Sequence, residues 1–419
     1  MSKTTKTDCC GEAGGGLLSV EEARRRMLAA VSPVTGVEQL GLRGALGRVL
    51  ADDLASPFDV PPFPNSAMDG YAVRSADCGG RERVTLDVVG SSFAGSPYEG
   101  EVGSGQAVRI MTGAVLPDGA DAVVMQERVQ RDGDRIGFDA AGVEAGLNVR
   151  YPGEDLQAGE PVLQQGRRLT AADLGLLASL GLGEVRVQRR LRVAFFSTGD
   201  ELRSVGQPLQ RGQIYDSNRY ILHGLLSEAG VELLDMGVIP DDRQAVRDAF
   251  REAAAMADAI VTSGGVSVGE ADFVKETLDE MGQVDFWKIA IKPGKPLAFG
   301  TLDGAVFFGL PGNPVSVMAT FYQFAKPALM KMAGARAGEP LTVRVRSADT
   351  LRKAPGRMEF QRGRLVHAED GHWEVHSTGR QGSHVLSSMS RADCFILLPA
   401  ESAGVEAGEE VEVQPFAGL

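Results

Sequence analysis

The stretch DAIVTSGGVSVGEADF, residues 258–273, combines a short apolar run, a glycine-rich loop and the start of a helix. Its apolar residues are small or β-branched and end at glycines, which is typical of a buried strand. Similar units precede it, since LRVAFF (191–196) is followed by the helical segment YDSNRYILHGLLSEAG (215–230) and by the strand VELLDMGV (231–238). Repeated strand and helix units of this length predict a doubly wound, largely parallel sheet.

The segments outside this unit have a different character. SPFDVPPFPN (56–65) carries four prolines in ten residues, too many for a helix or a central strand. Short β-rich runs separated by glycine and proline follow it, and alternating strands return after Leu341. Ser19 and Glu22 form a capping-box pattern that predicts a helix from about Ser19 to Val31. The expected organisation begins with a flexible tail (1–16) and an N-terminal helical or mixed domain in two segments (17–56 and 148–188). An inserted β domain (57–147) separates these segments. An α/β domain (189–338) and a C-terminal β domain (339–419) follow.

Composition excludes several classes of protein. The 419 residues include 43 Lys and Arg against 56 Asp and Glu, a net charge of −13, and 43% are hydrophobic. This content predicts a folded chain of several domains, and the acidic balance opposes general binding to nucleic acid or an anionic membrane. No run of 18 apolar residues occurs, so we expect no membrane span. An anionic ligand would therefore need a local cluster of positive charge.

The four cysteines show no metal-type spacing and no disulfide framework. Cys9 and Cys10 lie in the polar, glycine-rich tail and receive no role. The start of the chain has no apolar core typical of a signal peptide, so a reducing, cytoplasmic location is expected. The five histidines lack zinc-type spacing, and no GxSxG nucleophile motif occurs.

Three loops at predicted strand ends carry possible chemistry, because ligands of open α/β sheets gather at the carboxyl ends of the strands. The loop 197–201 (STGDE) offers hydroxyls and carboxylates, although a solvated acidic turn is the alternative. The glycine-rich loop 262–269 suits a phosphate, because its amides can turn inward before a helix, but it is neither a Walker loop nor a dinucleotide fingerprint. A tight strand-to-helix turn is its alternative.

The third loop concentrates positive charge. Lys288, Lys292 and Lys295 occur within eight residues and are stiffened by Pro293 and Pro296. In an acidic protein this predicts an anion-binding site, because lysine commonly serves as a point charge on phosphate or an oxyanion. The alternative is a solvated basic turn, which fits poorly with this much proline and glycine.

Nine motifs, in order along the chain, resemble the molybdopterin molybdenumtransferase family, which contains bacterial MoeA proteins and the E domain of gephyrin. They are PFPNSAMDGYAV, RIMTGA, FSTGDEL, GQIYDSNR, VTSGGVSVGEADF, WKIAIKPGKP, FGLPGNPVS, PGRMEFQRG and QGSHVLSS. The resemblance implies a multi-domain α/β plus β fold, in which the central doubly wound domain is similar to the molybdopterin-binding fold. It extends from about residue 19 to the C-terminus.

The same resemblance implies a reaction and its partners. Adenylyl-molybdopterin and molybdate would be converted to molybdenum cofactor and AMP with a divalent metal such as Mg²⁺. The protein would be an elongated homodimer with active sites shared between subunits, supplied by the enzyme that makes adenylyl-molybdopterin. Two alternatives on the same fold are a molybdopterin adenylyltransferase, which would lack the inserted and C-terminal β domains, and a scaffold protein.

Residues that match the family's functional positions are carried over one by one. The expected catalytic residues are Asp69, Thr112, Glu201, Asp241, Asp272, Lys288 and Lys292. The expected metal ligands among them are Glu201, Asp241 and Asp272, although Asp241, beside Asp242, also stands where a helix cap is expected. The expected substrate or oxyanion contacts are Ser263, Gly264, Gly265, Ser267, Lys295, Ser316, Arg362 and Ser383. Pro311 and Pro314 are expected to shape their loop.

Overall fold

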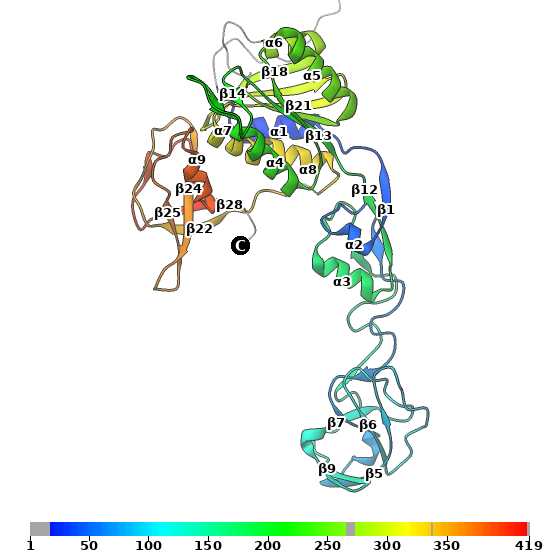
Figure 1. Ribbon diagram of the computed structural model, residues 1–419. Helices are drawn as coiled ribbons and strands as arrows, with labels where there is room; N and C mark the ends of the chain where they lie inside the picture. The colour runs from blue at the N-terminus through cyan, green and yellow to red at the C-terminus, as the bar shows by residue number, and fades with distance from the viewer. Residues whose placement is uncertain (1–16, 265–272, 337, 417–419) are drawn as a thin grey trace, which may run out of the picture.

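The computed structural model describes residues 17–264, 273–336 and 338–416. The chain is elongated: the inserted β domain and the α/β domain lie at opposite ends, with the N-terminal domain between them (Figure 1). The C-terminal β domain lies beside the α/β domain. The expected multi-domain fold class is confirmed. None of the helices in the described part of the chain is long and apolar enough to cross a membrane.

The α/β domain contains a six-stranded sheet in the order β16-β13-β17-β21-β20-β18. Four neighbouring strands pair in parallel, namely β16 (Glu232–Ile239), β13 (Arg192–Thr198), β17 (Ala259–Ser263) and β21 (Ala305–Leu310). Strand β20 (Pro296–Leu302) is antiparallel to β21, and β18 (Gly282–Lys288) is antiparallel to β20. Strand β18 therefore runs in the same direction as the four parallel strands.

Both faces of this sheet are covered, as the alternation along β13 requires. Val193 and Phe195 join a core with α4 (Ser217–Ala229), α7 (Pro314–Thr320), the π-helical turn η3 (Phe321–Ala325) and α8 (Lys326–Met332). Ala194 and Phe196 join the opposite core with α5 (Arg243–Met256) and α6 (Phe273–Met281). The sheet is thus doubly wound, as predicted.

Helix α1 (Val20–Ala30) begins at the predicted N-cap, where Ser19 Oγ accepts from Glu22 N at 3.1 Å. The sequence predicts this helix as part of the N-terminal domain, because it lies within residues 17–56. Its buried face, Val20, Ala23 and Met27, instead belongs to the core of the α/β domain against η3 and α8. The helical pattern identified this apolar face, but it contained no information about which domain would cover it.

The N-terminal domain is built where the two chain segments meet. Strand β1 (Val37–Gly41) pairs with β12 (Glu184–Gln188), and β2 (Leu54–Ala55) pairs with β11 (Pro161–Leu163). Helices α2 (Leu42–Ala45) and α3 (Ala171–Ser179) cover a small core of their own. Helix α3 begins with a capping box between Thr170 and Asp173.

A short two-stranded ladder joins the inserted β domain to the rest of the chain. In this ladder β3 (Asn65–Ser66) pairs with β10 (Val149–Arg150). Its six-stranded sheet has the order β7-β4-β6-β5-β9-β8. The strands are β4 (Gly70–Val73), β5 (Arg83–Ser92), β6 (Gln106–Ile110), β7 (Ala122–Met125), β8 (Val129–Asp132) and β9 (Arg135–Asp139).

The C-terminal domain is a barrel, because β24 pairs with both β25 and β26 and so closes the sheet. Its strands are β22 (Val343–Ser347), β24 (Met358–His367), β25 (Trp373–Ser377), β26 (Cys394–Leu398) and β28 (Glu410–Pro415), with helix α9 (Leu386–Ser390) between β25 and β26. A two-residue strand from the α/β chain, β19 (Ile291–Lys292), adds in parallel to β24. The lysine loop is thus tied to the barrel by backbone pairing.

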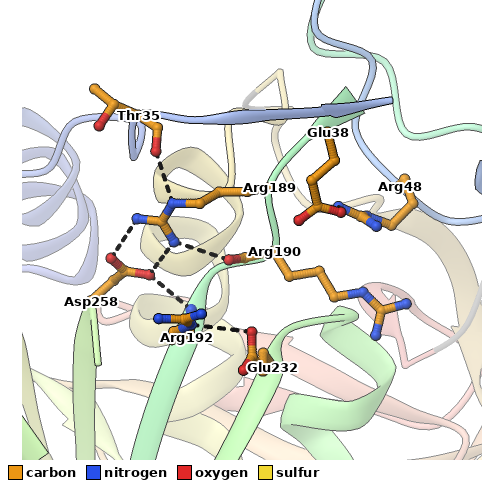
Figure 2. Close-up of polar contacts among 8 residues, drawn as sticks. All are labelled: Thr35, Glu38, Arg48, Arg189, Arg190, Arg192, Glu232 and Asp258. Atoms are coloured by element: carbon orange, nitrogen blue, oxygen red, sulfur yellow. Dashed lines mark hydrogen bonds and ion pairs between the residues drawn. The ribbon is translucent and has the colours of Figure 1, made fainter. Parts of the chain in front are cut away.

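One set of polar contacts at the junction between the N-terminal and α/β domains centres on Arg189 (Figure 2). Arg189 donates to both carboxylate oxygens of Asp258 at 2.7 and 2.8 Å and to the Thr35 carbonyl at 2.8 Å. Asp258 also accepts from the Arg192 amide at 2.9 Å. Gly36, at φ +121°, lies against the Arg189 stem, where a Cβ would come within 2.9 Å of Cδ. Two chain segments connect the domains, one containing Thr35 and the other Arg189. Both are therefore linked by hydrogen bonds to Asp258, the residue directly before β17.

Asp258→Asn should destabilise the junction. Burial alone would raise the pKa of the Asp258 carboxyl, but the hydrogen bonds from Arg189 and from the Arg192 amide outweigh burial and lower it. The ion pair therefore adds stability above the unfolded-state pKa of about 3.9 and loses it as the pH falls through the folded-state pKa. We expect a loss of about 1–3 kcal/mol in the free energy of unfolding at pH 7, shrinking below about pH 4. Urea unfolding at pH 7 and again below about pH 4 measures this free energy. Asp279→Asn, on the exposed face of α6, is the control, and equal midpoints for both variants would contradict a role for the pair.

Candidate active site

The candidate residues of the α/β domain gather at one edge of its sheet. Strands β16, β13, β17, β21 and β18 all run in the same direction, so their carboxyl ends lie together. The segments that follow these ends contain, in order, Asp241, Glu201, Gly264, the 311–314 turn and the lysine loop that begins at Lys288. This is the edge at which ligands of open α/β sheets bind.

The ends of the central strands pack tightly around Gly264. Its amide donates to the Leu310 carbonyl at 3.1 Å, and its φ of +92° suits glycine. A Cβ here would lie 3.0 Å from the Thr198 carbonyl oxygen, so the close approach of β13 and β17 also favours glycine. Ser263, which is 2% exposed, is directly paired with Ser197 across the two strands. Gly265, Ser267 and Asp272 lie outside the described residues.

Several buried polar atoms at this edge have no hydrogen-bond partner among the residues that the structure describes. They are Ser197 Oγ and Thr262 Oγ1 at the strand ends, and Asp216 Oδ2 and Asn218 Oδ1 at the start of α4. Each such group costs about 1–3 kcal/mol unless a ligand or water satisfies it. Asn218 is placed by a 2.7 Å hydrogen bond to the Gly312 carbonyl. Asp216 and Asn218 belong to the motif GQIYDSNR, but neither is among the site residues predicted from the sequence.

Two acidic loops meet beside these strands. The Asp241 amide donates to Asp200 Oδ1 at 3.2 Å. Burial, followed by the charges of Asp200 and Glu201, raises the pKa of Asp241, which shows that the three carboxylates lie within electrostatic range of one another. The cap of α5 is Asp242, whose Oδ1 accepts from the amides of Gln244 and Ala245 at 3.0 and 2.9 Å. The capping alternative for Asp241 is therefore wrong, and its carboxylate is available to a ligand.

The lysine loop is closely packed and internally hydrogen-bonded. Gly294, at φ +108°, is buried against helix α7, where a Cβ would come within 2.6 Å of Thr320 Cγ2. The Ile289 amide donates to the Lys295 carbonyl at 2.9 Å. Lys288 and Lys295 are exposed, whereas the Lys292 ammonium lies 3.1 Å from a carboxylate oxygen of Glu359 on the barrel. The loop therefore presents two exposed cations and one that is already paired.

The barrel reaches the same edge through its loop 380–383. The Val315 amide, in the first turn of α7, donates to the Ser383 carbonyl at 3.1 Å, which brings Ser383 next to the turn that carries Ser316. Ser316 is 4% exposed. These two serines, widely separated in the sequence, are thus brought together.

Arg362 occupies a different position from the one expected. It is 1% exposed and donates to Ser388 Oγ at 3.0 Å and to the carbonyls of Arg380 and Gly382 at 3.3 and 3.1 Å. Burial lowers its pKa to about 10, against the opposing effect of Glu359. Alternation along β24 puts Arg362 on the strand face opposite Glu359, so its guanidinium supports the loop from within the domain. We describe it as a positioning residue.

Arg362→Met should release this loop. The variant loses three hydrogen bonds made by a buried cation and leaves two carbonyls unsatisfied, so we expect a loss of about 2–4 kcal/mol in the free energy of unfolding. Hydrogen exchange of residues 378–385 should accelerate in the folded protein, as mass spectrometry of peptides would show. Arg364→Met, two residues further along the same strand at an exposed position, is the matched control. Unchanged exchange in the Arg362 variant would contradict its supporting role.

Asp69 and Thr112 lie in the inserted β domain. Both the amide and the hydroxyl of Thr112 donate to Asp69 Oδ1, at 2.8 and 2.7 Å. The amide hydrogen bond, with the hydroxyl second, lowers the pKa of Asp69 and keeps it ionised. The structure brings these two residues together, as expected. It does not bring them to the carboxyl ends of the α/β strands of their own chain, because the inserted β domain and the α/β domain lie at opposite ends of the molecule (Figure 1).

The carboxylates described at this edge do not form a complete metal site by themselves. Among the residues that the structure describes, no three His, Cys, Asp or Glu side chains are arranged to hold a metal ion. Glu201 and Asp241 supply hard oxygen donors, and Mg²⁺ is commonly bound by one or two carboxylates together with water and substrate phosphates. The donor set is therefore compatible with such a shared site.

Comparison with known proteins gives one consistent match along the chain. Three family models match in order: the MoeA N-terminal region (domain I and II) over residues 18–181, a probable molybdopterin binding domain over 194–331, and the MoeA C-terminal region (domain IV) over 344–416. A molybdopterin molybdenumtransferase of Haemophilus influenzae is 48% identical over 96% of this chain and 99% of its own length. A second, from Nostoc, is 39% identical over 90% of this chain and 88% of its own. The crystal structure of a molybdopterin biosynthesis MoeA protein from Pyrococcus horikoshii has a TM-score of 0.83 at 33% identity, covering 96% of this chain and all of that one.

Proposed function

Because the chain belongs to the molybdopterin molybdenumtransferase family, we propose that it transfers molybdenum from molybdate to adenylyl-molybdopterin, with release of AMP. The family models cover the N-terminal and C-terminal parts of the chain as well as the α/β domain. A molybdopterin adenylyltransferase corresponds to the α/β domain alone, so that alternative is disfavoured. The scaffold alternative does not account for the polar loops gathered at one sheet edge.

One observation carries the proposal: the lysine loop is held rigidly at the same sheet edge as the unpartnered polar atoms of β13, β17 and α4. The substrates are all anionic, since the pterin phosphate, the phosphoanhydride and molybdate each carry negative charge. Cleaving a phosphoanhydride requires charge neutralisation and in-line positioning more than a protein nucleophile. Lys288, Lys292 and Lys295 would neutralise and orient these groups, and Ser263, Ser316 and Ser383 would donate hydrogen bonds to them.

The acidic loops have a separate task in this scheme. Glu201 and Asp241 would hold Mg²⁺ beside the substrate phosphates, and the ion would supply Lewis-acid stabilisation of the charge that develops there. Two neighbouring carboxylates repel each other, which agrees with the raised pKa of Asp241. Asp272, carried over from the family, remains a proposed third ligand. The enzyme that makes adenylyl-molybdopterin would be the partner that supplies the substrate.

The first test is molybdate-dependent release of AMP. The purified protein is incubated with adenylyl-molybdopterin, with and without molybdate and Mg²⁺, and AMP is measured. We expect AMP only when all components are present, and a fall in turnover on the order of 10²-fold for Glu201→Gln. Glu252→Gln, on the exposed face of α5, is the control. Equal AMP release without molybdate would show that the proposed reaction is wrong.

We further propose a homodimer in which each site is shared between subunits. Asp69 and Thr112 are separated from the strand ends of their own chain by the N-terminal domain, so a partner's β domain would have to complete each cleft. In a dimer with twofold symmetry, this exchange would be reciprocal. Such an arrangement predicts a specific outcome when two inactive variants are mixed.

Asp69→Asn and Glu201→Gln homodimers should each be nearly inactive. After subunit exchange, about half of the dimers would be mixed, and each of these would contain one cleft with both defects and one with neither. The mixture should therefore recover up to about a quarter of wild-type activity. Native mass spectrometry verifies the exchange. A mixture that exchanges fully yet stays inactive would place the whole site within one chain.

A further inference from the structure

We propose that Glu359, on the C-terminal barrel, is a positioning residue for Lys292, and that affinity for the oxyanion depends on this contact between two domains. The inference rests on the proposed function, because it takes Lys292 as an oxyanion ligand. Glu359 belongs to the motif PGRMEFQRG, in which sequence analysis assigned only Arg362.

Backbone pairing fixes the two residues opposite each other. Strand β19 pairs in parallel with β24, with Ile291 opposite Met358 and Lys292 opposite Glu359. The Met358 amide donates to the Ala290 carbonyl at 2.8 Å, which extends the same ladder. The register of two strands therefore sets the distance between the ammonium and the carboxylate, and each oxygen of Glu359 lies 3.1 Å from Lys292 Nζ.

The carboxylate is the anchored member of this pair. Glu359 is 4% exposed, and its Oε1 accepts from Gln361 Nε2 at 3.1 Å. Gln361 is itself held, because the same nitrogen donates to the Arg352 carbonyl at 3.1 Å. The Lys292 side chain, by contrast, is 47% exposed. A free lysine samples many rotamers, so a fixed carboxylate restricts where its ammonium can be.

The ammonium keeps a face for another ligand. It has three N–H donors, and a cavity of about 500 Å³ lies beside it, whose lining includes Lys292, Glu359 and Gln361 together with Gly379, Gln381 and Gly382 of the barrel loop. This loop continues into Ser383, whose carbonyl contacts the first turn of α7. The pair therefore lies between the lysine loop and the barrel loop that we assign to the oxyanion site.

Two roles for Glu359 lead to opposite results. If it only neutralised Lys292, removing its charge would strengthen oxyanion binding, because the net positive potential would rise. If it positions the ammonium, removing its charge weakens binding, because the lysine is released into its other rotamers. The anchoring by Gln361 and the exposure of Lys292 favour positioning.

A double-mutant cycle tests this with molybdate as the probe. Isothermal titration measures the Kd of molybdate for the full-length wild type, Lys292→Met, Glu359→Gln and the double variant. We expect each single substitution to raise Kd about 3- to 10-fold, and the double variant to bind no more weakly than Lys292→Met, because Glu359 acts through Lys292. Glu359→Asp keeps the charge but shortens the side chain, so its Kd should lie between those of the wild type and Glu359→Gln.

The controls separate the possible failures. Glu412→Gln removes a carboxylate that lies 3.7 Å from Arg344 on the same barrel and should leave Kd unchanged. If wild type does not bind molybdate, or Lys292→Met binds it normally, the oxyanion role of Lys292 in the proposed function is wrong and the inference falls with it. If only Lys292→Met is impaired, or the two effects add, the positioning role alone is overturned. Thermal melting shows whether Glu359→Gln is folded, and Glu359→Asp provides the same comparison if it is not.

Discussion

The common direction of five strands is the constraint on which the candidate site depends. A parallel sheet brings the carboxyl ends of its strands to one edge. Segments far apart in the sequence therefore meet there without needing a specific contact between them. Strand β18 reaches this direction by two antiparallel steps through β20 and β21. If only one antiparallel step separated β18 from β21, Lys288 would leave the sheet at the opposite edge, away from Glu201, Gly264 and Asp241.

Polar contacts, rather than a shared core, control how some of the domains meet. The N-terminal and inserted β domains have small cores of their own, and the junction of the former with the α/β domain is fastened by Arg189 and Asp258. At the barrel, the contact between Lys292 and Glu359 adds to an apolar core that the two domains share, in which Phe360, Phe395 and Leu397 pack with residues of the α/β domain. Charge pairs of this kind depend on geometry and so define an orientation, whereas apolar surfaces tolerate sliding.

The fold was largely predictable because its signals are local. Alternating strand and helix patterns, glycines at strand ends and proline-stiffened loops each depend on a few neighbouring residues. The site was only partly predictable. The choice of Asp242 rather than Asp241 as the cap of α5 is a shift of one residue between neighbouring aspartates. The burial of Arg362 beneath its loop and the packing of helix α1 in the α/β core, by contrast, depend on partners distant in sequence. No local pattern identifies such partners.

Strand β19 also has a consequence for how the chain matures. The lysine loop acquires its partner strand only after 67 further residues, when Glu359 emerges during synthesis. Until then, Ile291 and Lys292 lack the strand with which they pair in the finished fold. The α/β domain and the barrel therefore form a unit that cannot be separated at their linker without leaving β19 unpaired and dividing the apolar core that the two domains share.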